Sequence, residues 1–266
     1  PKTVDNDLPA TDHCPGFGSA ARYFAQSAVD LGIDIHSLPT PVSILEVIGR
    51  NAGWLVAATM AARESSDDAP HLIYVPEVPL AADRFLAGVE EAYRRRGWVV
   101  AAVSEGLRDE TGRGWGERSG SADDGFGHAL PGDVAAALAA LTTSRLRLRA
   151  RNEKPGLCGR ASSLLASEVD RAEAEAVARF AAAHALAGNF GFMAAIERLA
   201  SVPYSVRYGA VPLESVANAE RNLPLEYLTP AQNDIAESYR AYVEPLMGGP
   251  LRRYACLNAR PRKERL

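Results

Sequence analysis

The chain has 266 residues, of which 47% are hydrophobic, so it can bury a core as one large domain or two small ones. Its net charge of −4 argues against a nucleic-acid-binding surface. No apolar run reaches the roughly 18 residues of a membrane span, and no secretory signal opens the chain. The cysteines Cys14, Cys158 and Cys256 lack metal-ligand or disulfide spacing, so we expect a reducing, cytoplasmic setting.

Short β-branched runs alternate with helical patterns along the chain, which predicts an α/β fold with a mainly parallel sheet. The predicted helices cover residues 19–30, 52–63, 81–95, 133–141, 172–187 and 230–242. The predicted strands cover residues 42–47, 72–75, 99–103 and 146–151. Asp170 is a candidate N-cap for the helix at residue 172.

Two stretches interrupt this alternation. Residues 109–132 hold seven glycines and several charges, which predicts a long loop. Residues 200–230 lack a clear periodicity, and we expect a connection there with one or two short strands.

The chain begins with Pro1 rather than Met, and a polar run with a catalytic appearance follows at once. An intact α/β domain would normally place a strand and a helix ahead of such a run. We therefore expect the sequence to be a fragment of a longer protein.

The first polar run carries two carboxylates, Asp5 and Asp7, separated by Asn6. Phosphoryl transfer to an alcohol needs a base near the hydroxyl and a carboxylate near the metal, and this run can supply both if the backbone turns there. A simple surface turn is at least as good an interpretation of Asp-Asn-Asp taken alone.

A second run places Gly49 and Arg50 after an apolar strand and before a helix. The glycine would let the backbone approach a ligand, and guanidinium is the preferred partner of phosphate. Open α/β sheets bind ligands at this edge, although a surface arginine after a turn explains the pattern about equally well.

A third run, Ser104-Glu105-Gly106, ends another predicted strand with a carboxylate. Glu105 could accept hydrogen bonds from sugar hydroxyls, or it could be an ordinary turn acid. A fourth run places Arg151 and Arg160 around a glycine-rich turn, where two converging arginines could hold a sugar phosphate. For Arg151, an exposed position on an edge strand is the simpler interpretation.

The order of these motifs resembles that of the 6-phosphofructokinase family, and in particular its pyrophosphate-dependent branch. The resemblance implies a three-layer α/β sandwich with mainly parallel sheets, of which this chain would be the C-terminal two-thirds, with the N-terminal part missing. Two interleaved lobes would divide near residues 40 and 150. The matching segments cover residues 3–7, 12–20, 48–54, 72–77, 126–128 and 245–248.

The resemblance also implies roles for the reacting groups. Asp5 matches the base that takes the proton from the 1-hydroxyl of fructose 6-phosphate, giving fructose 1,6-bisphosphate. Asp7 matches the companion carboxylate, near Mg²⁺ and the transferring phosphoryl group. Thr3 matches a residue beside the acceptor and donor phosphates.

Further positions match the binding groups for the sugar. Gly49 and Arg50 match a Met-Gly-Arg segment in which Ile48 replaces the methionine. Glu105 matches the sugar-binding acid, and Arg160 matches the arginine that holds the 6-phosphate.

Arg151 aligns with an arginine that reaches the phosphate of a neighbouring subunit, so the resemblance implies a homo-oligomer, a dimer or a tetramer. The chain departs from the family at Leu157, Gly159 and Pro41. The family often has His or Tyr and then Gln at the first two positions, and a second cross-subunit arginine at the third. These departures put the acceptor in question.

Lys2 bears on the donor, because pyrophosphate-using members read Pro-Lys-Thr where ATP-using bacterial members usually have Gly. An ammonium beside Asp5 could neutralise the phosphate that leaves when pyrophosphate is split. The alternatives are an ATP-dependent 6-phosphofructokinase and a non-catalytic regulatory paralogue. A dinucleotide-binding oxidoreductase is disfavoured because no Gly-x-Gly-x-x-Gly follows a predicted strand.

Overall fold

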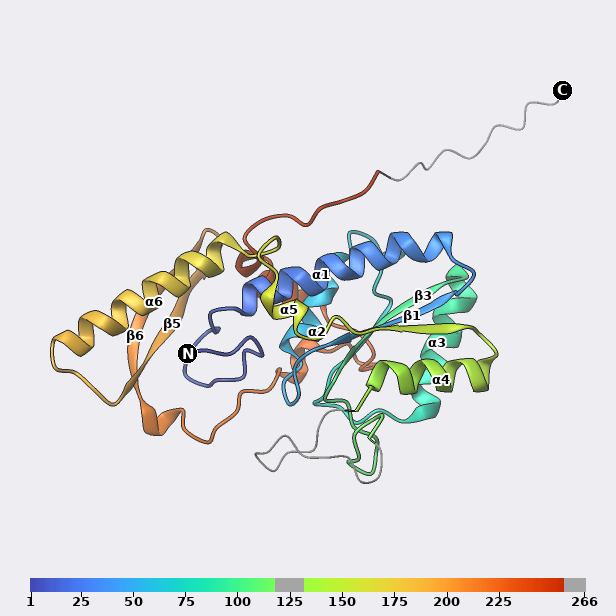
Figure 1. Ribbon diagram of the computed structural model, residues 1–266, viewed down its shortest axis with the longest axis horizontal. Helices are drawn as coiled ribbons and strands as arrows, with labels where there is room; N and C mark the ends of the chain where they lie inside the picture. The colour runs from blue at the N-terminus through green and yellow to red at the C-terminus, as the bar shows by residue number, and fades with distance from the viewer. Residues whose placement is uncertain (118–131, 256–266) are drawn as a thin grey trace.

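The computed structural model describes residues 1–117 and 132–255, and its centre is a four-stranded parallel sheet (Figure 1). The strand order is β2-β3-β1-β4, and each adjacent pair is parallel. The strands are β1 (Val42–Val47), β2 (Leu72–Tyr74), β3 (Val99–Ser104) and β4 (Ala150–Glu153). Every residue of β1, β2 and β3 is buried, as expected for parallel strands covered on both faces.

Helices cover both faces of this sheet, which confirms the predicted α/β sandwich. On β1, the side chains of Leu45 and Val47 join the core beneath α1 (Phe17–Asp34) and α2 (Trp54–Ala58). The intervening side chains of Val42 and Ile44 join the opposite core, beneath α3 (Ala82–Arg96) and α4 (Val134–Leu146). This division follows from the two-residue period of a strand.

A second part of the chain projects from the sheet lobe, and we call it the hairpin arm (Figure 1). It consists of α6 (Glu168–Leu186) packed on the antiparallel strands β5 (Phe192–Ser201) and β6 (Tyr204–Pro212). The apolar cluster between helix and hairpin is small, with Val177, Ala194 and Ile196 as its buried members. The short helices α5 (Cys158–Ala161) and α7 (Arg240–Val243) lie before and after the arm in the sequence.

The sequence-based strand at residues 146–151 was placed too early. Leu146 is the last residue of α4, and Arg147 follows in the left-handed conformation with φ 59°. The alternating Leu-Arg-Leu-Arg sequence has the period of a strand, but β4 begins only at Ala150. The predicted helix at 52–63 is α2 followed by a 3₁₀ turn at Thr59–Ala62.

The region after residue 187 differs most from the prediction. The hairpin occupies residues 192–212, so its strands start earlier and run longer than the short strands expected within 200–230. The helix predicted at 230–242 is reduced to a 3₁₀ turn at Glu237–Tyr239 and to α7. An isolated antiparallel bridge between Leu228 and Ile235 occupies the backbone that the helix would have needed.

The cap of α6 is Ser167 rather than Asp170, because the Ser167 side chain accepts a hydrogen bond from the Asp170 amide. Asp170 instead receives hydrogen bonds from the backbone of Gly16 and from Ser19 at the start of α1. The arm is thus joined to the sheet lobe through the carboxylate of Asp170. The predicted lobe division near residues 40 and 150 stays a prediction.

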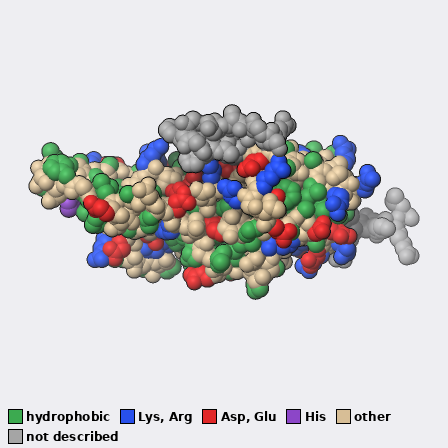
Figure 2. Space-filling view, turned by 90° about the horizontal axis from the view of Figure 1, so that it is seen from below, with side chains coloured by type: hydrophobic (Ala, Val, Ile, Leu, Met, Phe, Trp, Pro, Cys, Tyr) green, Lys and Arg blue, Asp and Glu red, His purple; other side chains and the backbone are tan. Residues whose placement is uncertain are grey.

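The surface is mixed in charge. On the face shown in Figure 2, basic and acidic side chains are interspersed over the sheet lobe and the arm. Within residues 1–117 and 132–255, no helix combines the length and the apolar character needed to cross a membrane. The expected loop at 109–132 is described as far as residue 117, and the remainder up to residue 131 lies outside the described residues, as do 126–128 of the matching segments.

Candidate active site

The carboxyl ends of β1 and β3 lie side by side, because Val47 and Ser104 are partners in the parallel register. Two polar runs that are distant in the sequence therefore meet at one sheet edge. The Gly49 amide donates to Glu105 Oε1 at 3.1 Å, and the Ser104 hydroxyl donates to the Gly49 carbonyl at 2.6 Å. The strand ends thus hold Glu105 next to the Gly49-Arg50 turn.

Glycine is required at two places in this edge. A Cβ on Gly106 would lie 1.6 Å from the carbonyl oxygen of Arg50, a distance that no side chain can tolerate. Gly49 has φ 126°, in the left-handed region that favours glycine. These two positions let the loops after β1 and β3 touch backbone to backbone, so Arg50 and Glu105 emerge together.

The segment with the paired carboxylates turns at Asn6. This residue is buried and left-handed, with φ 61°, a conformation that asparagine adopts more readily than most residues. Its side chain accepts from the Cys14 amide at 3.0 Å and donates to the Tyr242 hydroxyl at 2.8 Å. The sequence analysis required a backbone turn between Asp5 and Asp7 for both carboxylates to serve one site, and the structure has this turn at Asn6.

Asp5 is the electrostatic centre of the site. Its burial raises its pKa to about 6, with further upward contributions from the charges of Asp7 and Glu105. The positive charges of Arg160 and Arg50 act in the opposite direction. Four side chains are therefore near enough to act on the Asp5 carboxyl group, and together with Asp5 they come from four separate stretches of the chain.

A cavity of about 330 Å³ opens on the Arg50 and Glu105 side of this group, and Asp5, Asp7 and Arg160 are not among its lining residues. Arg50 and Glu105 line it, together with Trp115, Glu117 and Glu220. It combines an aromatic wall with convergent polar groups, as small-molecule sites commonly do.

Comparison with known proteins agrees with this geometry. Residues 1–185 match the family model described as phosphofructokinase. The chain belongs to the phosphofructokinase family. The predicted fold and family are therefore confirmed.

Individual relatives sharpen the comparison. The chain is 40% identical, over 94% of its length, to "Pyrophosphate--fructose 6-phosphate 1-phosphotransferase" of Xanthomonas campestris, and it covers 60% of that protein. It is 34% identical, over 93% of its length, to "Sulfofructose kinase" of Alkalicoccus urumqiensis, of which it covers 62%. The chain thus spans about three-fifths of the length of these relatives.

Among solved structures, the pyrophosphate-dependent phosphofructokinase from Marinobacter aquaeolei superposes with a TM-score of 0.82 at 38% identity. The match covers 94% of this chain and 59% of that one.

The remaining predicted residues of this phosphofructokinase chain lie around the centre or away from it. The Thr3 hydroxyl accepts from the Asp5 amide at 3.1 Å, while Lys2 is exposed at the start of the same segment. Ile48 is partly buried and packs against the core rather than facing outward. Arg160 is exposed on α5, within electrostatic reach of Asp5.

Arg151 lies away from this group in the described structure. Its guanidinium, on β4, is paired with Asp34 at 2.8 Å and with Glu153 at 2.9 Å. Its role toward a neighbouring subunit stays a prediction.

The departures at Leu157 and Gly159 have local consequences. A Cβ on Gly159 would lie 2.3 Å from the Phe24 ring, so the packing of α5 on α1 requires glycine here. Leu157 is 64% exposed in the turn that leads to Arg160. The turn therefore offers an apolar side chain near the predicted phosphate arginine.

A Mg²⁺ ion fits these residues only as a partner shared with substrate. Among the described residues, no group of three or more His, Cys, Asp or Glu side chains is arranged to hold a metal ion. Mg²⁺ commonly takes one or two carboxylates and completes its shell with water and substrate phosphates. Asp7, beside Asp5, is suited to such a role.

Two polar groups that hold the carboxylate segment were missed by the sequence analysis. Arg221 binds the backbone of this segment, and no motif around residue 221 indicated it. His13 is buried between Asp12, at 2.8 Å, and Glu173, at 2.6 Å. The run Asp12-His13 belonged to a matching segment, but its buried partner lies 160 residues further on.

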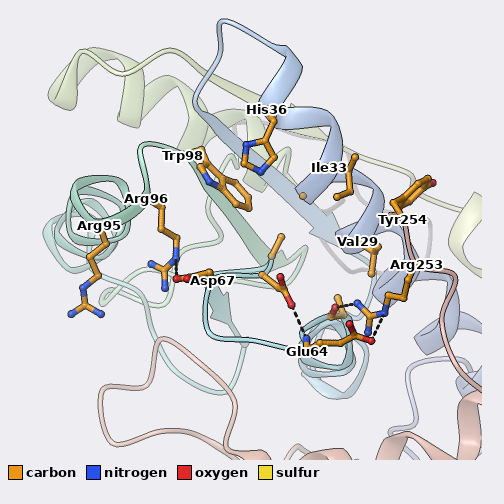
Figure 3. Close-up of a pocket in the computed structure, with 14 residues that line it drawn as sticks. Val29, Ile33, His36, Glu64, Asp67, Arg95, Arg96, Trp98, Arg253 and Tyr254 are labelled. Atoms are coloured by element: carbon orange, nitrogen blue, oxygen red, sulfur yellow. Dashed lines mark hydrogen bonds and ion pairs between the residues drawn. The ribbon is translucent and has the colours of Figure 1, made fainter. Parts of the chain in front are cut away.

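A separate cavity of about 470 Å³ lies near the amino end of the sheet (Figure 3). Trp98, immediately before β3, lies in it beside His36, with ring centres 4.4 Å apart. Arg96 pairs there with Asp67, and Arg253 pairs with Glu64. Because parallel strands place their reactive loops at the carboxyl edge, we assign this cavity no part in the site around Asp5.

Proposed function

We propose that the protein carrying this chain transfers a phosphoryl group from pyrophosphate to the 1-hydroxyl of fructose 6-phosphate. The observation that carries the proposal is the position of Asp5, half-buried among two carboxylates and two arginines at the sheet edge. The names of the relatives support the substrates, since a curated relative and a separate solved structure, both named for pyrophosphate-dependent enzymes, match along most of this chain.

In this proposal the arginines bind the phosphate of the sugar, and the acidic Glu105 binds its hydroxyl groups. Arg50 and Arg160 supply guanidinium groups for the 6-phosphate, a contact that is charge-assisted and can be bidentate. Glu105, fixed by the Gly49 amide, accepts hydrogen bonds from sugar hydroxyls. The 1-hydroxyl is then directed toward Asp5.

Asp5 acts as the general base. As the 1-oxygen forms its bond to phosphorus, its proton passes to the Asp5 carboxylate, and the bond from phosphorus to the leaving phosphate breaks. A pKa of about 6 leaves Asp5 mostly ionised at neutral pH and more basic than an ordinary carboxylate. Both properties favour proton abstraction under physiological conditions.

The donor is positioned by the start of the same segment. Asp7 would hold Mg²⁺, which supplies electrostatic stabilisation to the transferring phosphoryl group when bound. Thr3 would donate to a phosphate oxygen, and the exposed Lys2 ammonium would neutralise the leaving phosphate. The alternative phosphoryl donor is ATP, as in an ATP-dependent 6-phosphofructokinase.

The acceptor has a second candidate. One relative is named for sulfofructose, and the exposed, apolar Leu157 immediately precedes α5, the helix that carries Arg160. A sulfonate carries one negative charge where a phosphate monoester carries almost two near neutral pH, so fewer polar partners would satisfy it. Sulfofructose therefore belongs in the acceptor comparison.

We also propose a homo-oligomer, a dimer or a tetramer, in which Arg151 leaves Asp34 to reach the neighbouring subunit's substrate phosphate. Mass measurement in solution and an Arg151→Ala variant test this. A monomer with full activity would contradict it.

The experiment that tests the function is an initial-rate comparison on the full-length protein that carries this chain, with Mg²⁺ present. Fructose 6-phosphate and sulfofructose are each offered with pyrophosphate or ATP. We expect the highest kcat/KM for pyrophosphate with fructose 6-phosphate. A higher value with ATP would replace the donor, and absence of turnover with every pair would favour the regulatory paralogue.

A further inference from the structure

The segment that carries Asp5 and Asp7 consists of turns and irregular backbone up to the start of α1 at Phe17. In Figure 1 it lies between the hairpin arm and the sheet lobe. Its hydrogen bonds to a strand are made at Thr11 and Asp12, which bind Ile196 of β5, so other groups must hold Asp5 and Asp7 relative to the sheet edge. Arg221 is the residue that makes most of the hydrogen bonds to its carbonyl groups.

Arg221 binds carbonyl oxygens on both sides of Asp7. Its guanidinium donates to Asn6 O at 2.9 Å, to Thr11 O at 2.7 Å and to Asp12 O at 2.6 Å. Its own backbone amide donates to Asp7 O at 2.6 Å. One residue thus joins two turns of the segment, and the rigid fork of a guanidinium suits this geometry as a lysine ammonium would not.

Arg221 is in turn fixed to the loop that carries Arg50. Its guanidinium lies 4.5 Å from the ring centre of Trp54, the first residue of α2, and the Trp54 indole donates to Arg221 O at 3.0 Å. The carboxylate of Glu77 accepts from both Gly53, at 2.8 Å, and Leu223, at 2.7 Å. The loop holding Arg221 is therefore tied to the helix that follows the Gly49-Arg50 turn.

We propose that Arg221 is a positioning residue for phosphoryl transfer, which sets the distance between the carboxylate segment and the sheet edge. The role rests on the proposed function, since it concerns the base of that reaction. Arg221 acts through the backbone of residues 6–12, so its loss displaces Asp5 without removing a group from the sugar pocket. Misplacement of a reacting group by about 1 Å can lower the rate about 10²-fold.

The test compares Arg221→Ala and Arg221→Lys with a matched control, Arg207→Ala. Arg207 is an exposed arginine of β6 that pairs with Glu197, far from the carboxylate segment in the sequence. We expect kcat to fall about 10²-fold in both Arg221 variants, with KM for fructose 6-phosphate within about threefold of wild type. Guanidinium chloride at low, non-denaturing concentration should partly restore Arg221→Ala, whereas NaCl at equal ionic strength should not.

Amide hydrogen exchange supplies a readout that needs no substrate. Exchange in residues 3–12 should accelerate in both Arg221 variants, while α3 stays at its wild-type rate. Unchanged exchange in residues 3–12, or unchanged kcat in a folded variant, would overturn the role of Arg221. If the wild type turns over no donor and acceptor pair, the proposed function fails, and exchange alone still decides whether Arg221 holds the segment.

Discussion

The two halves of the candidate site are held by different forces. Arg50 and Glu105 extend from strands whose residues are all buried, and their loops touch through Gly106. Asp5 and Asp7 lie on irregular backbone that Asn6 and Arg221 secure by hydrogen bonds. The sheet edge therefore rests on buried strands as well as on the hydrogen bonds to Gly49, whereas the proposed base, Asp5, depends on polar contacts that a single substitution can release.

The largest expected effect concerns the base itself. Asp5→Asn keeps the size of the side chain and removes its basicity, so kcat should fall about 10²–10⁴-fold. KM for fructose 6-phosphate should change little, because the binding groups remain. Asp83→Asn, at an exposed carboxylate on α3, is the matched control, and steady-state rates of both variants give the comparison.

The same substitution should stabilise the fold. The pKa of Asp5 is raised from 3.8 to about 6, so ionisation above pH 6 costs folding free energy, on the order of 1–3 kcal/mol. Asp5→Asn should therefore gain stability at pH 7.5 in urea unfolding. An unfolding free energy equal to or lower than that of the wild type would show that the ionised Asp5 carboxylate does not destabilise the fold.

The second effect is the loss of stability expected when His13, in the segment that carries Asp5 and Asp7, is replaced. Both ring nitrogens face carboxylates, and the hydroxyl of Tyr204 and the guanidinium of Arg198 complete the network around Glu173 and Asp12. His13→Ala removes the imidazole between the buried Glu173 and the partly buried Asp12, which keep Tyr204 and Arg198 as partners, so the unfolding free energy should fall by about 3 kcal/mol. His36 is an exposed histidine, so His36→Ala should lower the unfolding free energy by much less in the same urea titration.

The contribution of His13 should depend on pH in one direction. Burial lowers its pKa, but hydrogen bonds and charges from Asp12 and Glu173 outweigh this, and the pKa is raised above 6.5. Its stabilising contribution is therefore complete below about pH 6.5 and lost as pH rises through the folded value. The difference in stability between wild type and His13→Gln should shrink from pH 6 to pH 9, and growth of that difference would contradict the charged pairing.

The third effect concerns the two arginines assigned to the 6-phosphate, Arg50 at the sheet edge and Arg160 on α5. Arg50→Ala and Arg160→Ala each remove a charge-assisted contact worth roughly 1.5–3 kcal/mol, so KM for fructose 6-phosphate should rise about 10–150-fold. Arg179→Ala, at an exposed arginine of α6, is the control. An unchanged KM in both variants would remove these arginines from the phosphate pocket.

The sequence predicted most of the packed half and little of the polar half. Buried strands have a strong local signal, so β1, β2 and β3 were found nearly to the residue. Gly49 and Glu105 were each placed at the end of a predicted strand, but the contact between them was not predicted. The family resemblance then selected Asp5 among many acidic residues.

The polar half depends on contacts between distant parts of the chain. Arg221 lies 215 residues from Asn6, and nothing near it in the sequence marks its partners. The hairpin was also obscured, because β6 alternates between partly buried and exposed residues without a continuous apolar face. Such elements are specified by tertiary contacts, which local periodicity does not contain.

The smallest effects are shifts in the acidic limb of the pH profile, and these test the central claim, that Asp5 is the base, most directly. The measurement is kcat/KM for fructose 6-phosphate from pH 5 to 9 in wild type, Asp7→Asn and Arg160→Ala. The sugar phosphate also titrates near pH 6, but it does so identically with all three proteins, so only differences among them report on the enzyme. Asp7 raises the pKa of Asp5 and Arg160 lowers it, so the limb should lie near pH 6 in wild type, lower in Asp7→Asn and higher in Arg160→Ala. A limb at the same pH in all three proteins would contradict the assignment of Asp5 as the base.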